Sequence, residues 1–219
     1  MRLAKMLGLA MVAATAMMAF IGVSSASATL PVVCHLEAGS PGDSFCPAGK
    51  LKFSGAILGL GEGFDTFLSG FVRVECQGHM EGEVEAATLH LGTIKKVVWS
   101  NCKNNIGCTT TSAAAEALPW TFHLLAPTGN EGLMHVLNVL GSFTLTGGFC
   151  GASTKCFYTS GNVLPVYLNH NGATVTSLHA KELPLSREAG SSALCSATGK
   201  WDALYKLTPG DLSVLLKKA

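Results

Sequence analysis

Three glutamates, Glu81, Glu83 and Glu85, alternate along one short segment and are the first candidates for chemistry. Carboxylates two residues apart could bind a hard cation such as calcium, or act as the acid and base of a glycosidase. No Asp-x-Asp-x-Asp loop accompanies them to help supply the oxygens that calcium requires. Nothing in the pattern would separate the pKa values of three like carboxylates. The row therefore predicts a solvated strand face, opposite Lys95 and Lys96.

Two other groups of residues could carry chemistry. The segment Gly42-Asp43-Ser44-Phe45 resembles the nucleophile block of the lipase and esterase family named for Gly-Asp-Ser, but no downstream Asp-x-x-His follows to supply a base. It predicts a polar turn beside a proline. The histidines form no His-x-His or His-Glu-x-x-His motif, so neither a metal site nor a catalytic residue is predicted from them. They are His35, His79, His90, His123, His135, His170 and His179.

The eight cysteines predict a covalent framework. An even number of cysteines in an exported chain indicates disulfides, because that compartment is oxidising. They are Cys34, Cys46, Cys76, Cys102, Cys108, Cys150, Cys156 and Cys195. Short spacing predicts three local bridges, Cys34–Cys46, Cys102–Cys108 and Cys150–Cys156. Subtraction then leaves Cys76–Cys195, with Cys76–Cys102 as the rival pairing. A separation of five residues does not fit the usual ligand spacing of a zinc site.

The elements that position these residues are short strands. In residues 72–76 and 80–85, apolar and charged side chains alternate with the period of a half-buried strand. Gln77-Gly78 is expected to reverse the chain between them. Residues 51–69 predict two short strands, and 89–102, 117–146 and 201–207 predict more. Residues 133–140 could be strand or short helix, with strand favoured. Further along, 162–178 predict a hairpin in which Pro165 marks an edge strand, and 211–218 predict a terminal turn or helix.

The first 28 residues predict a secretory signal peptide. Arg2 and Lys5 precede an apolar run, and Ala26-Ser27-Ala28 supplies small residues for cleavage. An uncleaved membrane anchor is the alternative reading. Removing this segment leaves residues 29–219 as one predicted domain, with 13 basic and 14 acidic residues. A near-neutral chain without a basic cluster predicts no nucleic-acid partner and gives no electrostatic footprint for an anionic membrane, and no later stretch predicts a stable membrane span.

The fold expected is all-β, a single disulfide-stapled antiparallel sandwich or barrel of roughly 9–12 strands. A Val-x-Cys strand end at Cys76, a strand closing at Cys102, and Trp201-x-x-x-Tyr205 after Cys195 resemble uncharacterised exported β-rich, disulfide-containing proteins of actinobacteria. The resemblance implies export and β-structure, and carries over no catalytic residue or cofactor. The function expected is a secreted, non-catalytic binding or cell-envelope module. The alternative is a secreted hydrolase using dispersed carboxylates such as Glu83 and Glu131.

Overall fold

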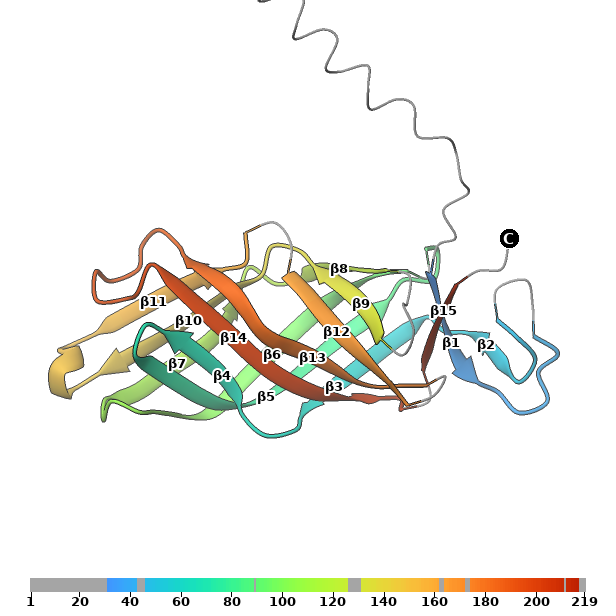
Figure 1. Ribbon diagram of the computed structural model, residues 1–219, viewed down its shortest axis with the longest axis horizontal. Helices are drawn as coiled ribbons and strands as arrows, with labels where there is room; N and C mark the ends of the chain where they lie inside the picture. The colour runs from blue at the N-terminus through green and yellow to red at the C-terminus, as the bar shows by residue number, and fades with distance from the viewer. Residues whose placement is uncertain are drawn as a thin grey trace, which may run out of the picture. The chain divides into compact units, whose positions relative to one another are not determined.

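The computed structural model describes residues 31–42, 46–88, 90–125, 131–161, 164–171, 174–210 and 212–216 (Figure 1). The predicted signal segment, residues 1–28, lies outside the described residues. Antiparallel strands dominate the rest, so the all-β prediction is confirmed. The strands are β1 (Pro31–Leu36), β2 (Lys50–Lys52), β3 (Gly55–Gly61), β4 (Asp65–Ser69), β5 (Val72–Val84), β6 (Leu91–Asn104), β7 (Thr109–Glu116), β8 (Trp120–Leu124), β9 (Glu131–Val136), β10 (Leu140–Thr146), β11 (Thr154–Thr159), β12 (Leu164–Asn171), β13 (Thr174–Arg187), β14 (Thr198–Thr208) and β15 (Ser213–Leu216).

The main sheet contains twelve strands whose pairings form a closed circuit. Four times, two consecutive strands lie end to end and together make one pass across the sheet. These are β3 with β4, β7 with β8, β9 with β10, and β11 with β12. In each case the two strands pair with the same neighbouring strand, or with two strands that themselves lie end to end. With β5, β6, β13 and β14 they make eight antiparallel passes, each beside the one before it in sequence. The interruptions explain why the described chain has fifteen strands when fewer were expected. Two of them contain residues with positive φ, Ala117 at 54° and Asn138 at 57°, which break the extended backbone.

A second sheet, in the order β15-β1-β2, lies at one end of the main sheet (Figure 1). Its central strand alternates between two environments. Val33 packs into the main core, where it lines a small apolar cavity with Leu212. Val32 and Cys34 instead pack on Cys46. The small sheet therefore covers one end of the main core. The sequence predicts a turn or helix over residues 211–218, but Ser213–Leu216 is strand because it pairs with Pro31–Cys34.

Large aromatic side chains fill the middle of the main core. Trp99, Trp120 and Trp201 project from β6, β8 and β14, and all are buried. Phe67 of β4 lies edge-on to Trp99, with ring centroids 4.8 Å apart, and parallel to Trp201 at 6.1 Å. Such offset and edge-to-face contacts add to the stabilisation that aromatic burial provides. The core is thus packed at its centre.

Two local predictions are wrong because long-range pairing overrides them. Gln77-Gly78 does not reverse the chain, and β5 continues through it to Val84. A Cβ on Gly78 would lie 2.2 Å from the carboxylate of Asp65, so the glycine makes room for a buried side chain. Pro165 does not mark an edge, because β12 lies between β9 and β13 and Pro165 is opposite His135.

All eight cysteines form disulfides, as expected, and Cys34–Cys46 is confirmed. The local pairs Cys102–Cys108 and Cys150–Cys156, and the remaining pair Cys76–Cys195, are wrong. The bridges are Cys76–Cys102, Cys108–Cys150 and Cys156–Cys195.

Strand pairing explains these disulfide partners. The β5–β6 ladder places Glu75 opposite Lys103, and it brings the Cα atoms of Cys76 and Cys102 within 4.1 Å. The β7–β10 ladder places Thr109 opposite Thr146, so the ends that carry Cys108 and Cys150 lie together. Pairing of β11 with β13 brings Cys156 to the loop that holds Cys195. Disulfide partners therefore follow the sheet and not the sequence spacing.

Among the described residues, no helix has the length and apolar character needed to cross a membrane. The four disulfides are consistent with an oxidising compartment outside the cytoplasm.

Candidate functional site

Four turns converge at the end of the main sheet that lies away from β1 (Figure 1). They are the β4–β5 turn (70–71), the β6–β7 turn (105–108), the β10–β11 segment (147–153) with the 3₁₀ helix η2 (Gly148–Cys150), and the β13–β14 loop (188–197). The Cys108–Cys150 disulfide joins the second turn to the third, and Cys156–Cys195 ties the fourth to β11. We call this region the disulfide-linked end.

An apolar pocket with a volume of about 170 Å³ opens between these turns. Its inner walls include Phe143 and Leu145 of β10, and Val72 and Ile106 lie nearer the turns. A cavity of about 150 Å³ with apolar walls is large enough to bind benzene, a molecule of six carbons. The pocket at the disulfide-linked end can therefore take an apolar group of about that size.

The polar side chains in the pocket already have partners within the protein. Thr154 donates its hydroxyl to the carbonyl of Cys150 at 2.9 Å. Ser69 Oγ lies 2.5 Å from the hydroxyl of Tyr158 and accepts a hydrogen bond from the backbone N–H of Ser196. Tyr158 in turn donates to the carbonyl of Ser196 at 2.8 Å. Since these hydroxyls bond each other and the backbone, the pocket selects for apolar groups.

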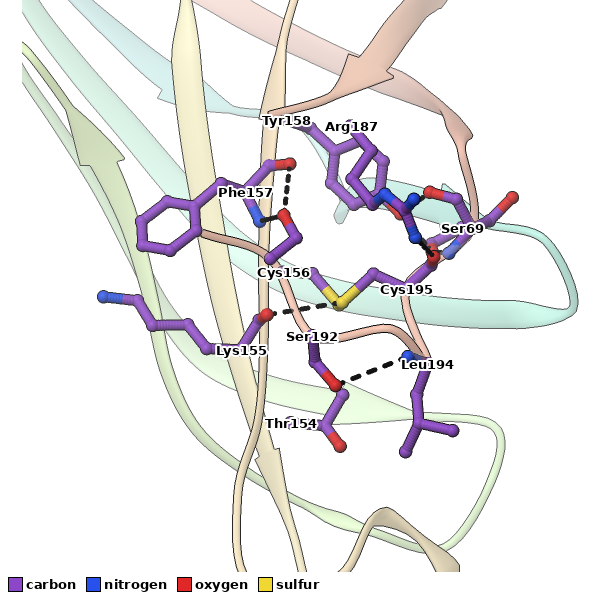
Figure 2. Close-up of a disulfide and its surroundings, with 12 residues drawn as sticks. Ser69, Thr154, Lys155, Cys156, Phe157, Tyr158, Arg187, Ser192, Leu194 and Cys195 are labelled. Carbon is purple, nitrogen blue, oxygen red and sulfur yellow. Dashed lines mark hydrogen bonds between the residues drawn. A yellow bond between two sulfur atoms is a disulfide. The ribbon is translucent and has the colours of Figure 1, made fainter. Parts of the chain in front are cut away.

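The same contacts hold the β13–β14 loop in place. Burial raises the pKa of Tyr158 above its usual value, although the Ser69 hydrogen bond and the charge of Arg187 oppose the shift. The phenol therefore stays protonated and keeps donating. Arg187 Nη1 donates to the carbonyl of Cys195 at 2.7 Å. Figure 2 shows the Cys156–Cys195 disulfide between two groups, with Tyr158 and Arg187 on one side of it and Leu194 on the other. These contacts fix the β13–β14 loop, and Leu194 projects from it into solvent.

Three large apolar side chains form the rim of the pocket: Phe71, Phe149 and Leu194. Their exposed fractions are 73%, 63% and 67%. Each comes from a different turn, namely β4–β5, β10–β11 and β13–β14. Single exposed apolar residues are common on protein surfaces, whereas a group of them around a pocket marks a site of interaction. The rim and the pocket together form our candidate functional site.

A second feature lies in the core, where Asp65 is buried at the start of β4. Its Oδ2 accepts hydrogen bonds from Trp99 Nε1 at 2.6 Å and from the hydroxyl of Tyr205. Burial raises the pKa of Asp65 to about 6, against the effect of both hydrogen bonds. Burial, followed by the charge of Asp65, raises the pKa of Tyr205 well above its usual value. Enclosed by these partners, Asp65 joins β4, β6 and β14 within the core.

The glutamate row lies on an exposed strand face, as predicted. Glu81 accepts a hydrogen bond from Lys96 Nζ at 2.6 Å, and Glu83 accepts one from Lys95. The Lys96 hydrogen bond is the main cause of the lowered pKa of Glu81. These are half-exposed ion pairs of the kind that contributes little to stability. The row faces solvent and lies outside the pocket at the disulfide-linked end.

The hydrolase hypothesis named Glu83 and Glu131, and the structure does not bring these residues together. Glu83 is on β5 and Glu131 begins β9, with β6 and β8 between them in the sheet. Three inter-strand steps of about 4.8 Å separate the two strands. The ladders also align Glu83 with Leu137, six residues beyond Glu131, which adds about 20 Å along the strand. The combined offset is too large for two glutamate side chains to approach within the separation of about 5–9.5 Å between the carboxyl groups of glycosidases. The side chain of Glu131 itself lies outside the described part of the chain.

The remaining sequence candidates add no site. Residues 43–45 of the Gly-Asp-Ser segment lie outside the described residues. Within the part of the chain that the structure describes, no three His, Cys, Asp or Glu side chains are grouped so that they could hold a metal ion. His79 lies 3.5 Å from Glu81, and His179 lies 3.8 Å from Asp202, each on the surface of a strand.

Sequence reasoning missed both the pocket rim and the buried carboxylate. A usable signal for the rim was a large apolar residue beside a turn glycine, as in Gly70-Phe71 and Gly148-Phe149. Turns are normally polar, so an aromatic residue there needs a partner or a function. No comparable signal distinguished Asp65, because its burial depends on three strands that are distant in sequence.

Function has to be inferred from the pocket, the rim and the charges of this chain. No protein-family model matches the sequence, and no curated protein or solved structure gives a significant match.

Proposed function

We propose that this chain is an exported, non-catalytic binding module that takes an apolar group into the pocket at its disulfide-linked end. The observation that carries the proposal is the pocket itself, with apolar walls, hydroxyls already bonded within the protein, and an exposed apolar rim. Concave sites lined mainly by apolar side chains are typical of small-molecule binding. Closed antiparallel sheets of about eight strands are also wide enough to hold one small ligand.

Export is supported by the basic and apolar N-terminal segment and by the disulfides. Residues 1–28 have the pattern of a cleaved secretory signal. Four disulfides with no free cysteine fit an oxidising environment outside the cytoplasm. The protein would then act as a secreted or cell-envelope component.

The size of the pocket limits the affinity for a free ligand. Burial of six carbons contributes about 5 kcal/mol, at about 0.8 kcal/mol for each CH₂ group. That gain corresponds to a Kd that is sub-millimolar at best. The affinity should also depend on chain length, with each added CH₂ lowering Kd about fourfold until the pocket is full.

A series of neutral alcohols from 1-butanol to 1-octanol tests the proposal. We expect Kd to fall about fifteenfold from butanol to hexanol, because two CH₂ groups are added inside the pocket. The decrease from hexanol to octanol should be smaller, because the added carbons reach the rim. Methyl NMR signals of Leu145 and Ile106, which line the pocket, should shift during each titration.

A pocket-filling variant provides the control. Ile106→Trp adds bulk at the half-buried wall and should abolish alcohol binding. Leu60→Trp adds similar bulk at an exposed position on β3 and should leave binding unchanged. A Kd that does not change with the chain length of the alcohol, or that is the same in Ile106→Trp as in the wild type, would show that the pocket is not the binding site.

A further inference from the structure

We propose that the disulfide-linked end docks on an anionic lipid surface, with the rim inserted among the lipids and the end of one acyl chain in the pocket. The acyl chain rests on the proposed function, since it occupies the same pocket. The docking itself rests on the rim and on the charges around it. Each part is supported by separate residues and can fail separately.

The rim is built to remain exposed. Phe71, Phe149 and Leu194 are more exposed than any other large apolar side chain in the described chain. They do not lie on loose segments. Phe149 is next to Cys150, which is bonded to Cys108, and Leu194 is next to Cys195, which is bonded to Cys156. The disulfides hold two of these turns, and the carbonyl of Phe71 accepts a hydrogen bond from Asn105 Nδ2 at 2.9 Å, so burial of the rim side chains requires an outside partner.

Cations surround the same end. Arg73, Lys103, Lys155 and Arg187 are exposed on the strand ends and turns that surround the pocket. Glu75 and Glu188 lie among them, and Glu75 is shared by Arg73 at 3.0 Å and Lys103 at 3.2 Å. These four positive and two negative charges sum to +2, and Glu182, Lys200 and Asp202, which line a hollow together with Arg73, bring the sum to +1. An apolar surface flanked by Lys and Arg matches the boundary of an anionic bilayer.

Two of these cations lie over aromatic rings. The ammonium group of Lys155 is 4.4 Å from the centre of the Phe157 ring, and that of Lys103 is 4.3 Å from Phe64. Each ammonium group therefore lies over the face of an aromatic ring, and the cation–π contact holds it at the protein surface.

A lipid surface also overcomes the weak affinity expected for a free chain. A pocket for about six carbons covers only part of an acyl chain, so the remainder must stay in an apolar environment. A bilayer provides that environment and presents many chains at high local concentration. The exposed rim would be buried in the same step. These three points favour a lipid surface over a dissolved ligand or a second protein.

Vesicle flotation tests the docking. Wild-type protein is mixed with vesicles of phosphatidylcholine alone or with about 30% phosphatidylglycerol, in 50 mM or 500 mM NaCl. We expect at least tenfold more protein on the anionic vesicles than on neutral ones at low salt. High salt should reduce this binding several-fold, because surface charges are screened.

A triple variant and a matched control identify the surface. Phe71→Ser/Phe149→Ser/Leu194→Ser should lower partitioning at least tenfold. Leu36→Ser/Leu51→Ser/Leu60→Ser removes three exposed apolar side chains from β1, β2 and β3, with exposed fractions of 52%, 40% and 49%. This control should bind like the wild type. A single Phe71→Trp variant, quenched by brominated lipid, reports insertion even if the triple variant does not fold.

The results separate docking from ligand binding. Alcohol binding without vesicle binding would overturn the docking and leave the proposed function standing. Vesicle binding that remains while the alcohol series fails would support the docking and refute the pocket as a ligand site. Equal vesicle binding by the rim variant would overturn the docking. A rim-dependent dimer in sedimentation analysis, without vesicle binding, would assign the surface to a second copy and also overturn it.

Discussion

The buried carboxylate of Asp65 should make the protein less stable as the pH rises from about 4 to about 7. Burial raises its pKa from 3.8 to about 6. The folded state therefore holds the proton more tightly than the unfolded state does. The resulting stabilisation is complete below about pH 4 and is lost as the pH rises through 6. A shift of about two pKa units corresponds to about 3 kcal/mol of unfolding free energy.

Asp65→Asn isolates this contribution from those of the other carboxylates. The amide oxygen can still accept from Trp99 and Tyr205, but the new NH₂ group must find an acceptor in the core. That cost, about 1–3 kcal/mol, does not vary with pH because the amide does not titrate. The unfolding free energy of the wild type minus that of Asp65→Asn should therefore be about 3 kcal/mol larger at pH 4 than at pH 7.5.

Guanidinium chloride unfolding of the oxidised protein provides the measurement. Tryptophan fluorescence is a suitable signal, because Trp99 bonds Asp65 directly. Glu83→Gln is the control, since it removes a half-exposed carboxylate and should change the pH dependence by less than about 1 kcal/mol. If the wild type and Asp65→Asn have parallel stability curves from pH 4 to 7.5, Asp65 does not titrate near 6, and the reasoning is refuted.

Two further changes test the packing and the framework. Gly78→Ala should lower the unfolding free energy by about 1–3 kcal/mol, because its Cβ would collide with Asp65. Gly141→Ala, whose Cβ would lie 3.4 Å from its nearest neighbour, should cost less in the same denaturation assay; equal costs would contradict the crowding at Gly78. Replacing Cys108 and Cys150 by serine opens a loop of 42 residues and should cost about 4 kcal/mol. Unchanged unfolding, or peptide mapping that finds other partners, would contradict that bridge.

The strand class was predictable because it depends on local alternation. Val74 and Cys76 are buried and Arg73 is exposed, as the period of two requires. Later in the chain, Trp120 and Phe122 are buried and Thr121 is exposed, in the same pattern. Side chains alternate between the two faces of a strand whichever strands it pairs with. The pattern can therefore be recognised without knowing the neighbouring strands. Participation of every cysteine in a disulfide was predictable for a similar reason, since it follows from an even count and an oxidising compartment.

The disulfide partners and the reversals were not predictable in the same way. Cys102 is six residues from Cys108, yet it bonds Cys76 because β5 and β6 are neighbours. The local sequence around Gly78 predicts a turn, but Gly78 lies within β5. A glycine is required there because the carboxylate of Asp65 on β4 occupies the place of a Cβ. In both cases, a partner distant in sequence decided the outcome.

Alternating side chains and an even number of cysteines are enough to predict antiparallel strands and disulfides in this protein. The place of the candidate site depends instead on contacts between residues that are distant in the chain. Phe71, Phe149 and Leu194 are separated by long stretches of chain, and they meet because a closed circuit of strands brings their turns to one end. The cations of that end gather for the same reason, although the whole chain is nearly neutral. Composition averages over the chain, whereas folding concentrates particular side chains at one place.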